Sequence, residues 1–246
     1  MPYIGGGLRT RLYPLTKNFP KPLLPVGDKT ILDWLIDDID GTGAVDSYVV
    51  ISNHLFFDVF VVWAGKKPQD ITVLDDGTES NETRLGAVRD IQFAIEKLNL
   101  NDDLLVIAGD NLLDFSLAPF ISYQKEKNSS CIMRYFEPDE NKLHKTGVVE
   151  TDSDDRITGM EEKPDNPKSN WCVPPFYIYK SSDVSLVKKG IENGCGTDTP
   201  GSFIVWLSKV TDVYAYEMPG RRYDIGNLES YEQVKANYKG ITNGVL

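Results

Sequence analysis

Glycine and arginine residues near the N-terminus form a pattern that could hold a phosphorylated ligand. Gly5, Gly6 and Gly7 follow a short apolar stretch, and Arg9 and Arg11 come almost directly after them. Glycines let the backbone approach a ligand closely and expose its N–H groups, while guanidinium groups add forked, charged hydrogen bonds. Glycines alone are typical of many tight turns, but together with the arginines they favour a cradle for a triphosphate.

A lysine between two prolines follows this cradle. Pro20, Lys21 and Pro22 precede the apolar run 23–26. Because each proline fixes its own φ and restricts the residue before it, the lysine lies on a stiff backbone. Such an ammonium group suits a charge aimed at a phosphate, although an isolated Pro-Lys-Pro is more often a surface turn.

Two aspartates have the chemistry of magnesium ligands. Asp110 comes directly after an apolar run, 104–108, and Asp224 comes shortly before Gly226. Carboxylate oxygens are the ligands that Mg²⁺ prefers, together with phosphate oxygens. Asp110 could instead cap a helix, but its place after a buried strand favours the metal. The sequence alone does not show that the two aspartates meet.

Strands that alternate with helices are expected to position these residues. Apolar runs predict strands over 2–4, 47–52, 104–108, 131–135, 146–150, 176–179 and 212–217, and helical periodicity predicts helices over 31–39, 55–63, 84–98, 116–127, 182–192, 202–208 and 228–238. This alternation favours a mostly parallel sheet covered on both faces, with the ligand beyond the carboxyl ends of the strands.

The stretch 5–26 resembles the signature of the sugar-1-phosphate nucleotidyltransferases, or NDP-sugar pyrophosphorylases. Both contain a Gly-rich loop, Thr-Arg-Leu, Pro-Leu-Thr and Pro-Lys-Pro-Leu-Leu-Pro-Val, and the segment 223–231 resembles a later motif of that family. Arg9 differs, since the family usually has a small residue there. The resemblance implies a three-layer α/β/α Rossmann-like nucleotidyltransferase fold with a mostly parallel mixed central sheet. It also implies one domain over residues 1–246, with a nucleotide-binding half (1–112) and an acceptor-binding half (113–246).

The resemblance also implies roles for individual residues in a reaction that releases pyrophosphate. An acceptor phosphate would attack the α-phosphorus of a nucleoside triphosphate, and the acceptor would be a sugar 1-phosphate. The implied catalytic residues are Arg11, Lys21 and Asp110, with Asp110 and Asp224 as ligands of Mg²⁺. The implied nucleotide-binding residues are Gly5, Gly6, Gly7, Arg9, Thr10, Gly77 and Gly86, and the implied acceptor-binding residues are Gly147, Glu162 and Lys163.

Several alternatives stay open at this point. The segments 75–78 and 81–87 lack the Gln and Pro of the common thymidylyl and uridylyl versions, so the base is undecided. Trp171 to Pro175 replace small residues near the expected sugar site. The acceptor could be a non-sugar phosphate such as phosphocholine. A GT-A-like glycosyltransferase would use an Asp-x-Asp motif, which Asp152 and Asp154 match within a polar run typical of a hairpin turn. A non-catalytic sugar-nucleotide sensor is the remaining alternative.

Composition narrows the range of binding partners and cellular compartments that we expect for the protein. The 246 residues carry a formal net charge of −11, which disfavours nucleic acid and anionic membranes as partners. Cys131, Cys172 and Cys195 show no metal-ligand spacing, and His54 and His144 show no triad pattern. With no signal-peptide pattern at the N-terminus, we expect a cytoplasmic protein that binds a nucleoside triphosphate and a sugar 1-phosphate. Homo-oligomerisation stays open.

Overall fold

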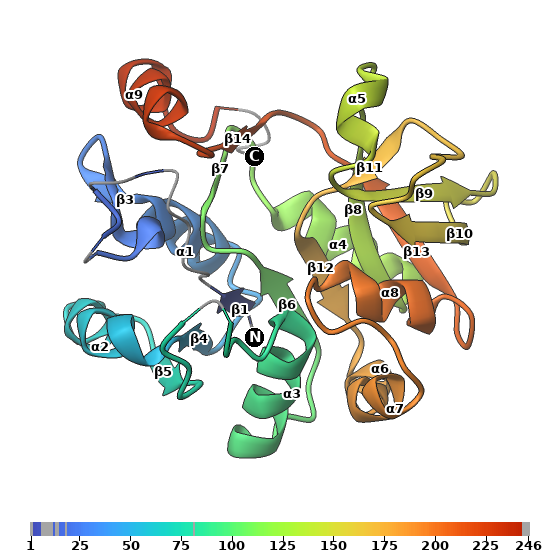
Figure 1. The fold of residues 1–246 in the computed structure, drawn as a ribbon, viewed down its shortest axis with the longest axis horizontal. Helices are drawn as coiled ribbons and strands as arrows, with labels where there is room; N and C mark the ends of the chain where they lie inside the picture. Colours follow the sequence, from blue (N-terminus) through green and yellow to red (C-terminus); the bar gives the residue numbers. More distant parts are fainter. Residues whose placement is uncertain (1, 6–11, 13–14, 18, 81, 243–246) are drawn as a thin grey trace. The chain divides into compact units, whose positions relative to one another are not determined.

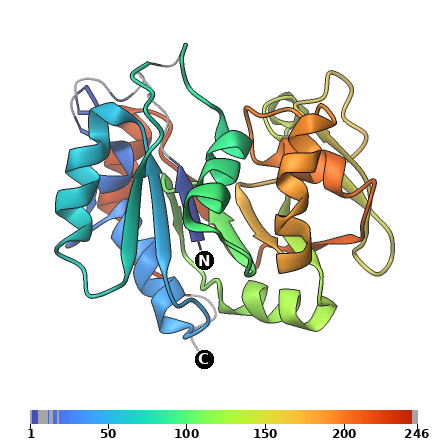
Figure 2. The ribbon, with the colours of Figure 1, turned by 90° about the horizontal axis from the view of Figure 1, so that it is seen from below.

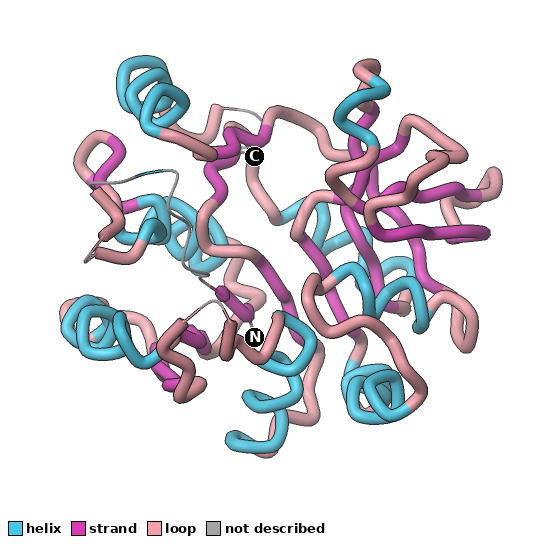
Figure 3. Tube along the Cα trace, in the orientation of Figure 1, coloured by secondary structure: helices cyan, strands magenta, loops and turns pink. Residues whose placement is uncertain are grey.

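A computed structural model describes residues 2–5, 12, 15–17, 19–80 and 82–242 of the chain (Figure 1). The chain forms two compact units that are interleaved along the sequence. Unit 1 comprises Met1–Arg84, Ala108–Pro119 and Pro219–Leu246, and unit 2 comprises Leu85–Ile107 and Phe120–Met218. Both units contain helices and strands (Figure 3). The predicted division into halves at residue 112 follows different boundaries and stays a prediction.

The sheet of unit 1 is parallel. Its strands are β1 (Pro2–Gly5), β4 (Tyr48–Ser52) and β5 (Ile71–Asp75), and β4 pairs with both of the others. The 3-10 helix η3 (His54–Phe56) leads into α2 (Phe57–Ala64), which packs on β4 and β5 (Figure 2). The strand predicted over 47–52 is therefore confirmed, and the helix predicted over 55–63 begins with a tighter turn.

The helix α1 (Ile31–Gly41) confirms the one predicted over 31–39. Thr30 starts it with a reciprocal cap: the Asp33 N–H donates to Thr30 Oγ1 (3.1 Å), and the Thr30 N–H donates to Asp33 Oδ2 (3.0 Å). This arrangement satisfies two backbone donors that a helix start leaves unpaired. The apolar face of α1 then packs in the interior of unit 1.

Short elements from three distant parts of the sequence complete unit 1. They are η2 (Lys21–Leu23), β2 (Pro25–Val26), β3 (Lys29–Thr30), β7 (Asn111–Leu113), β14 (Arg222–Asp224) and α9 (Leu228–Asn237). One buried apolar cluster joins them, formed by Leu12, Leu24, Val26, Ile31, Leu112, Ile225, Tyr231 and Val234. Burial of these side chains holds the N-terminal motif, the strand after Asp110 and the C-terminal motif together.

The sheet of unit 2 has the order β10-β9-β11-β8-β12-β6, and β13 pairs with β8. The bounds are β6 (Leu104–Ile107), β8 (Ser130–Phe136), β9 (Gly147–Thr151), β10 (Ile157–Glu162), β11 (Trp171–Val173), β12 (Phe176–Tyr179) and β13 (Val213–Glu217). The pairing of β13 with β8 is parallel, whereas the neighbours along the order are antiparallel. Turns as short as 152–156 can join only antiparallel strands, which explains this departure from the expected parallel order.

The helices of unit 2 follow the predicted segments with shifted ends. They are α3 (Ala87–Leu98), most of α4 (Ala118–Lys127), α5 (Glu140–Leu143), α6 (Ser181–Val184), α7 (Leu186–Glu192) and α8 (Gly201–Leu207). The helix predicted over 84–98 starts later, because Gly86 has a φ of +88°, which is incompatible with an α-helix. The helix predicted over 182–192 is two helices. None of the helices in the described ranges has both the length and the apolar character needed to cross a membrane.

Candidate active site

Lys21 and Asp110 form a half-buried ion pair in unit 1. Lys21 begins η2 directly after Pro20, whose φ is −71°, and Pro22 and Leu23 are buried behind it. The lysine Nζ lies 2.8 Å from Asp110 Oδ2, and the two side chains are only 8% and 22% exposed. Two opposite charges so far out of water must compensate each other. The stiff Pro-Lys-Pro segment therefore directs its ammonium group at the predicted metal ligand.

The second oxygen of the Asp110 carboxylate is also bound. The Asn111 side-chain amide donates to Asp110 Oδ1 (3.1 Å) and to the Ala108 carbonyl (2.8 Å), and Arg222 Nη1 donates to Asn111 Oδ1 (2.8 Å). This chain of hydrogen bonds fixes the orientation of the carboxylate before any ligand binds. It also links the segment that follows β6 to the segment around β14. Sequence reasoning missed both Asn111 and Arg222, although each is a neighbour of a predicted aspartate in the sequence.

The backbone of Asp224 lies across from the residue next to Asp110. The strands β14 and β7 pair in antiparallel fashion, and Asp224 stands opposite Asn111, with Tyr223 opposite Leu112. Asp110 directly precedes β7 and Asp224 ends β14, so two aspartates separated by more than a hundred residues in sequence are attached to the same small sheet. Their joint binding of a metal ion stays a prediction.

Most of the predicted triphosphate cradle lies outside the described residues. Gly5 ends β1. Gly6, Gly7, Arg9, Thr10 and Arg11 fall in the range that the structure does not describe. Their contacts with a nucleotide, and the effect of Arg9, remain predictions from the sequence.

The predicted base-reading segment of unit 1 is held by its own hydrogen bonds. Gly77 has a φ of +73°, and its N–H donates to Asp75 Oδ1 (2.8 Å). The carbonyl of Thr78 accepts from the His54 N–H (2.9 Å). His54 Nδ1 lies 2.6 Å from Asp75 Oδ2, and this hydrogen bond raises the pKa of His54. Partial burial opposes ionisation of Asp75, but the bonds from His54 and Gly77 leave the pKa of Asp75 lowered.

Gly86 belongs to unit 2 and has a packing role that sequence reasoning missed. Its φ is +88°, and a Cβ there would lie 2.5 Å from the Thr197 carbonyl oxygen. The Val88 N–H donates to the same oxygen (3.1 Å). The start of α3 therefore packs backbone against backbone on segment 197–198, which only glycine allows. Whether Gly77 and Gly86 also read a base stays a prediction.

The three predicted acceptor-binding residues lie together in unit 2. Gly147 and Glu162 stand opposite each other on β9 and β10, and a Cβ at Gly147 would lie 3.0 Å from Glu162 Oε2. Lys163 follows with a φ of +49°, and its N–H donates to the Thr146 carbonyl (3.1 Å). A left-handed backbone at a lysine is unusual and is held here by this hydrogen bond and by the β9–β10 pairing that ends at Glu162.

The carboxylate of Glu162 is crowded from a second side. Gly201, the first residue of α8, leaves no room for a Cβ beside Glu162 Oε2, and Thr199 forms a hydrogen bond with this carboxylate. Burial raises the pKa of Glu162, against the opposing effects of the Lys163 charge and the Thr199 hydrogen bond. Thr199 and Gly201 were not among the predicted site residues. The cluster of glycine, threonine and proline in 194–201 is the only signal that could have drawn attention to them.

Trp171 begins β11, which lies between β9 and β8 in the unit 2 sheet, and packs on side chains of β8. Its ring meets Phe136 edge to face at 5.6 Å between centroids, and the Arg134 guanidinium lies 4.5 Å from its centroid. These are ordinary contacts between neighbours on β8 and β11, worth on the order of 1 kcal/mol each. They account for the tryptophan as a packing residue.

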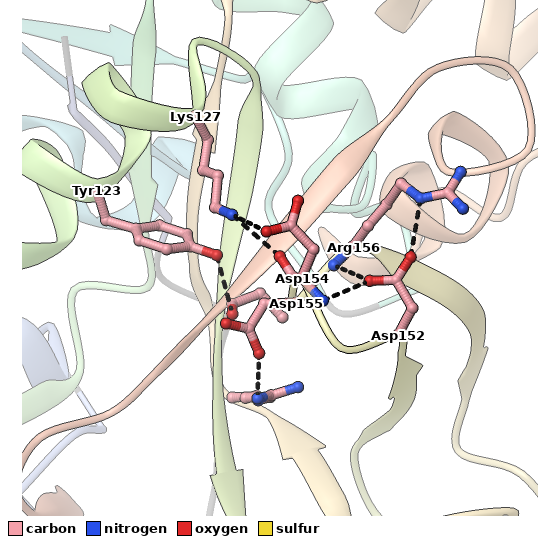
Figure 4. Close-up of polar contacts among 8 residues, drawn as sticks. Tyr123, Lys127, Asp152, Asp154, Asp155 and Arg156 are labelled. Carbon is pink, nitrogen blue, oxygen red and sulfur yellow. Dashed lines mark hydrogen bonds and ion pairs between the residues drawn. The ribbon is translucent and has the colours of Figure 1, made fainter.

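The Asp-x-Asp pair forms a hairpin turn between β9 and β10 (Figure 4). Asp152 Oδ1 accepts from the backbone N–H groups of Asp154 and Arg156, both at 3.0 Å, and Oδ2 accepts from Arg156 Nε at 3.1 Å. Asp154 pairs with Lys127 at 3.0 Å. Because local donors and cations engage these carboxylates, the motif has the expected turn structure. Among the described side chains, no three His, Cys, Asp or Glu residues are grouped closely enough to hold a metal ion by themselves.

Comparisons with known proteins identify the family of the chain. The model of the nucleotidyl transferase family matches residues 4–240. A glucose-1-phosphate adenylyltransferase of Clostridium novyi is 27% identical, over 98% of this chain and 66% of that protein. One from Clostridium acetobutylicum is 25% identical, over 92% of this chain and 63% of that protein. The chain thus spans a little under two thirds of the length of these relatives.

Solved structures share the fold over nearly the whole chain. A protein from Bacillus anthracis described as a glucose-1-phosphate thymidylyltransferase, solved with sucrose, has a TM-score of 0.78 at 22% identity and covers 99% of this chain and 96% of its own. A UDP-glucose pyrophosphorylase solved with UDP-glucose has a TM-score of 0.77 at 18% identity, with 96% and 97% covered. The predicted Rossmann-like nucleotidyltransferase fold is confirmed. Because the family model matches almost every residue, this chain belongs to the nucleotidyl transferase family.

Proposed function

We propose that this protein transfers a nucleotidyl group from a nucleoside triphosphate to a sugar 1-phosphate, forming an NDP-sugar and releasing pyrophosphate. The observation that carries the proposal is the Lys21–Asp110 ion pair beside the β7–β14 ladder, where Asp224 stands opposite Asn111. Family membership supports a nucleotidyltransferase. The names of the relatives, glucose-1-phosphate adenylyltransferases, support a sugar 1-phosphate as the acceptor.

The residues around Asp110 fit a magnesium ion. Asp110, which directly precedes β7, and Asp224 on the paired strand β14 would supply two carboxylates, the donor set that Mg²⁺ takes when substrate phosphates supply further oxygens. The ion would neutralise charge on the phosphates. Lys21, which balances Asp110 at 2.8 Å, would share its charge with the α-phosphate during attack. Arg11 would bind the departing pyrophosphate, as the family resemblance implies.

Unit 2 would hold the acceptor. Lys163 would bind the acceptor phosphate, and the Glu162 carboxylate would accept hydrogen bonds from sugar hydroxyls. Gly147 would let the sugar ring approach β9, because it has no side chain beside Glu162. The attacking phosphate is an anion at neutral pH, so its attack on the α-phosphorus needs no general base. Catalysis then consists of positioning and electrostatic stabilisation.

A pyrophosphate-release screen tests this proposal. Each of the triphosphates ATP, dTTP, UTP, CTP and GTP is paired with a panel of sugar 1-phosphates and with phosphocholine, with and without Mg²⁺. We expect magnesium-dependent release with at least one sugar 1-phosphate. Release with phosphocholine alone would contradict the sugar acceptor. Consumption of a ready-made NDP-sugar without a triphosphate would favour a glycosyltransferase, and nucleotide binding without turnover would favour a sensor.

A further inference from the structure

The helix α2 carries apolar side chains on its buried face and on its exposed face. Phe60 and Trp63 are buried against the unit 1 sheet. On the opposite face, Val61 is 43% exposed and Val62 is 59% exposed, and Leu55 in the preceding turn is 54% exposed. A helix that is apolar all round is normally covered on all sides. In the described structure of this chain, the outer face of α2 is not covered.

Two opposite charges border this exposed surface, which we call the α2 patch (Leu55, Val61 and Val62). At 100° per residue, Asp58 falls between Val61 and Val62 around the helix axis. The Lys66 N–H donates to the Trp63 carbonyl (3.1 Å), so a turn continues beyond Ala64 and places the exposed Lys66 at the C-terminal end of α2. Asp58 and Lys66 are both exposed, and neither forms a salt bridge within the described ranges. The α2 patch is thus an apolar strip with an acid at one end and a base at the other.

The spacing of these residues makes the α2 patch complementary to itself. Val62 lies four residues after Asp58 and four before Lys66. If two copies of α2 cross in antiparallel fashion at Val62, the two-fold axis passes through that residue. Asp58 of each copy then faces Lys66 of the other, because an isologous contact repeats every pair twice. Helices in contact have their axes about 8–10 Å apart, a separation that valine side chains fill well.

We propose that the α2 patch is a homodimer interface and that its occupant is the α2 patch of a second copy of this chain. The pairing of Asp58 with Lys66 across the axis provides attraction despite the net charge of −11, which otherwise makes copies repel. One pair of short helices buries less surface than a standard interface, so the dimer is concentration-dependent rather than permanent. The proposal uses none of the residues placed in the candidate active site and does not depend on the proposed function.

Sedimentation velocity of the full chain over a range of concentrations tests the interface. We expect the wild type to shift from monomer to dimer as its concentration rises. Val62→Asp places two carboxylates on the axis and abolishes the dimer. Asp58→Lys and Lys66→Asp each replace two attractions with two repulsions and weaken dimerisation about tenfold. The double variant Asp58→Lys/Lys66→Asp restores it, because the swapped charges face each other again.

A matched control separates this interface from general surface effects. Val210 is 55% exposed and belongs to unit 2, so Val210→Asp should dimerise like the wild type. Thermal unfolding confirms that each variant is folded. Val62→Cys should crosslink to itself on oxidation, whereas Val210→Cys should not. A wild type that stays monomeric at every concentration overturns the proposal. A dimer that persists in Val62→Asp also overturns it, and so does a double variant that dimerises as weakly as the single variants. Binding of the α2 patch to lipid vesicles in place of self-association also overturns it.

Discussion

At the residue scale, the sequence identified side chains that could take part in chemistry more readily than it identified the residues that contact them. Pro20 and Pro22 restrict the backbone around Lys21, a local effect that can be inferred from three letters. That Lys21 meets Asp110 at 2.8 Å depends on residues 89 positions away and could not be inferred from that segment. Thr199 and Gly201 were missed for the same reason, since their contact with Glu162 arises only when α8 packs beside β10.

The raised pKa of Glu162 predicts how Glu162→Gln changes stability with pH. Burial disfavours the ionised carboxylate in the folded state, so the pKa is higher there than in the unfolded chain. The unfolded chain therefore loses this proton first, and folded-state stability falls as pH rises from the ordinary glutamate pKa through the raised one. Glutamine removes this loss. We expect Glu162→Gln to have a higher Tm than the wild type at pH 8, with a gap that narrows toward pH 5.

The same variant is expected to raise the KM for the acceptor about tenfold, since a hydrogen bond to a charged group is lost. Glu161→Gln is the control, because Glu161 is an exposed neighbour that pairs with Lys168 at 3.2 Å. Differential scanning calorimetry at several pH values measures the stability. A constant Tm difference at every pH would contradict the assigned origin of the raised pKa.

At the scale of elements, periodicity predicted the long helices and strands but did not predict the short strands. β7 and β14 have three residues each, which is too few to show the two-residue periodicity of a strand or the 3.6-residue periodicity of a helix. Their pairing is imposed by the buried cluster that contains Leu112 and Ile225. The start of α3 was misplaced by three residues, because the role of Gly86 depends on the distant segment 197–198. Local sequence thus specifies a helix better than its ends.

Gly86 offers a test of how α3 is anchored. Gly86→Ala places a side chain at a φ of +88° and against the Thr197 carbonyl, so strain and steric overlap add. At a ψ of 151° this positive φ lies in a region that is nearly exclusive to glycine, and such a backbone costs roughly 1–3 kcal/mol for a residue with a Cβ. We expect Tm to fall by at least about 4 °C, given roughly 2–4 °C per kcal/mol in a chain of this size. Thermal unfolding followed by circular dichroism measures the effect.

Gly41→Ala is the matched control for this substitution. Gly41 is the last residue of α1, and a Cβ there would have no neighbour within 4 Å. Alanine should leave Tm unchanged or raise it, because it lowers the entropy of the unfolded chain. Equal Tm values for Gly86→Ala and the wild type would show that α3 does not depend on the close backbone contact.

At the scale of the whole molecule, the site of unit 1 is assembled from the beginning, the middle and the end of the chain. The Tyr231 hydroxyl donates to the Pro25 carbonyl at 2.7 Å across 206 residues of sequence. The motifs follow one another along the chain in the order seen in the sugar-1-phosphate nucleotidyltransferases, and this resemblance favoured that family. Their convergence follows from the burial of one shared apolar cluster, which no single motif reveals. This convergence places Asp110 beside Lys21, a contact that capping or turn formation does not require.

The double variant Lys21→Met/Asp110→Asn separates fold from function in this site. Removing one member of a half-buried ion pair leaves the other charge uncompensated, at a cost of roughly 3–5 kcal/mol. Removing both charges restores electrical balance. The free energy of unfolding of the double variant should therefore be closer to that of the wild type than that of either single variant is. Its turnover should nevertheless be lost. Recovery of turnover together with stability would mean that the pair is structural only.

The most direct test of the account is pyrophosphate release as a function of Mg²⁺ concentration in the wild type and in Asp110→Asn. Asp46→Asn is the control, since Asp46 is an exposed carboxylate of unit 1 away from the pair. We expect strict magnesium dependence in the wild type and in the control, and a loss of at least about a hundredfold in kcat/KM in folded Asp110→Asn. Turnover by the wild type without a divalent ion, or undiminished turnover by Asp110→Asn, would contradict it.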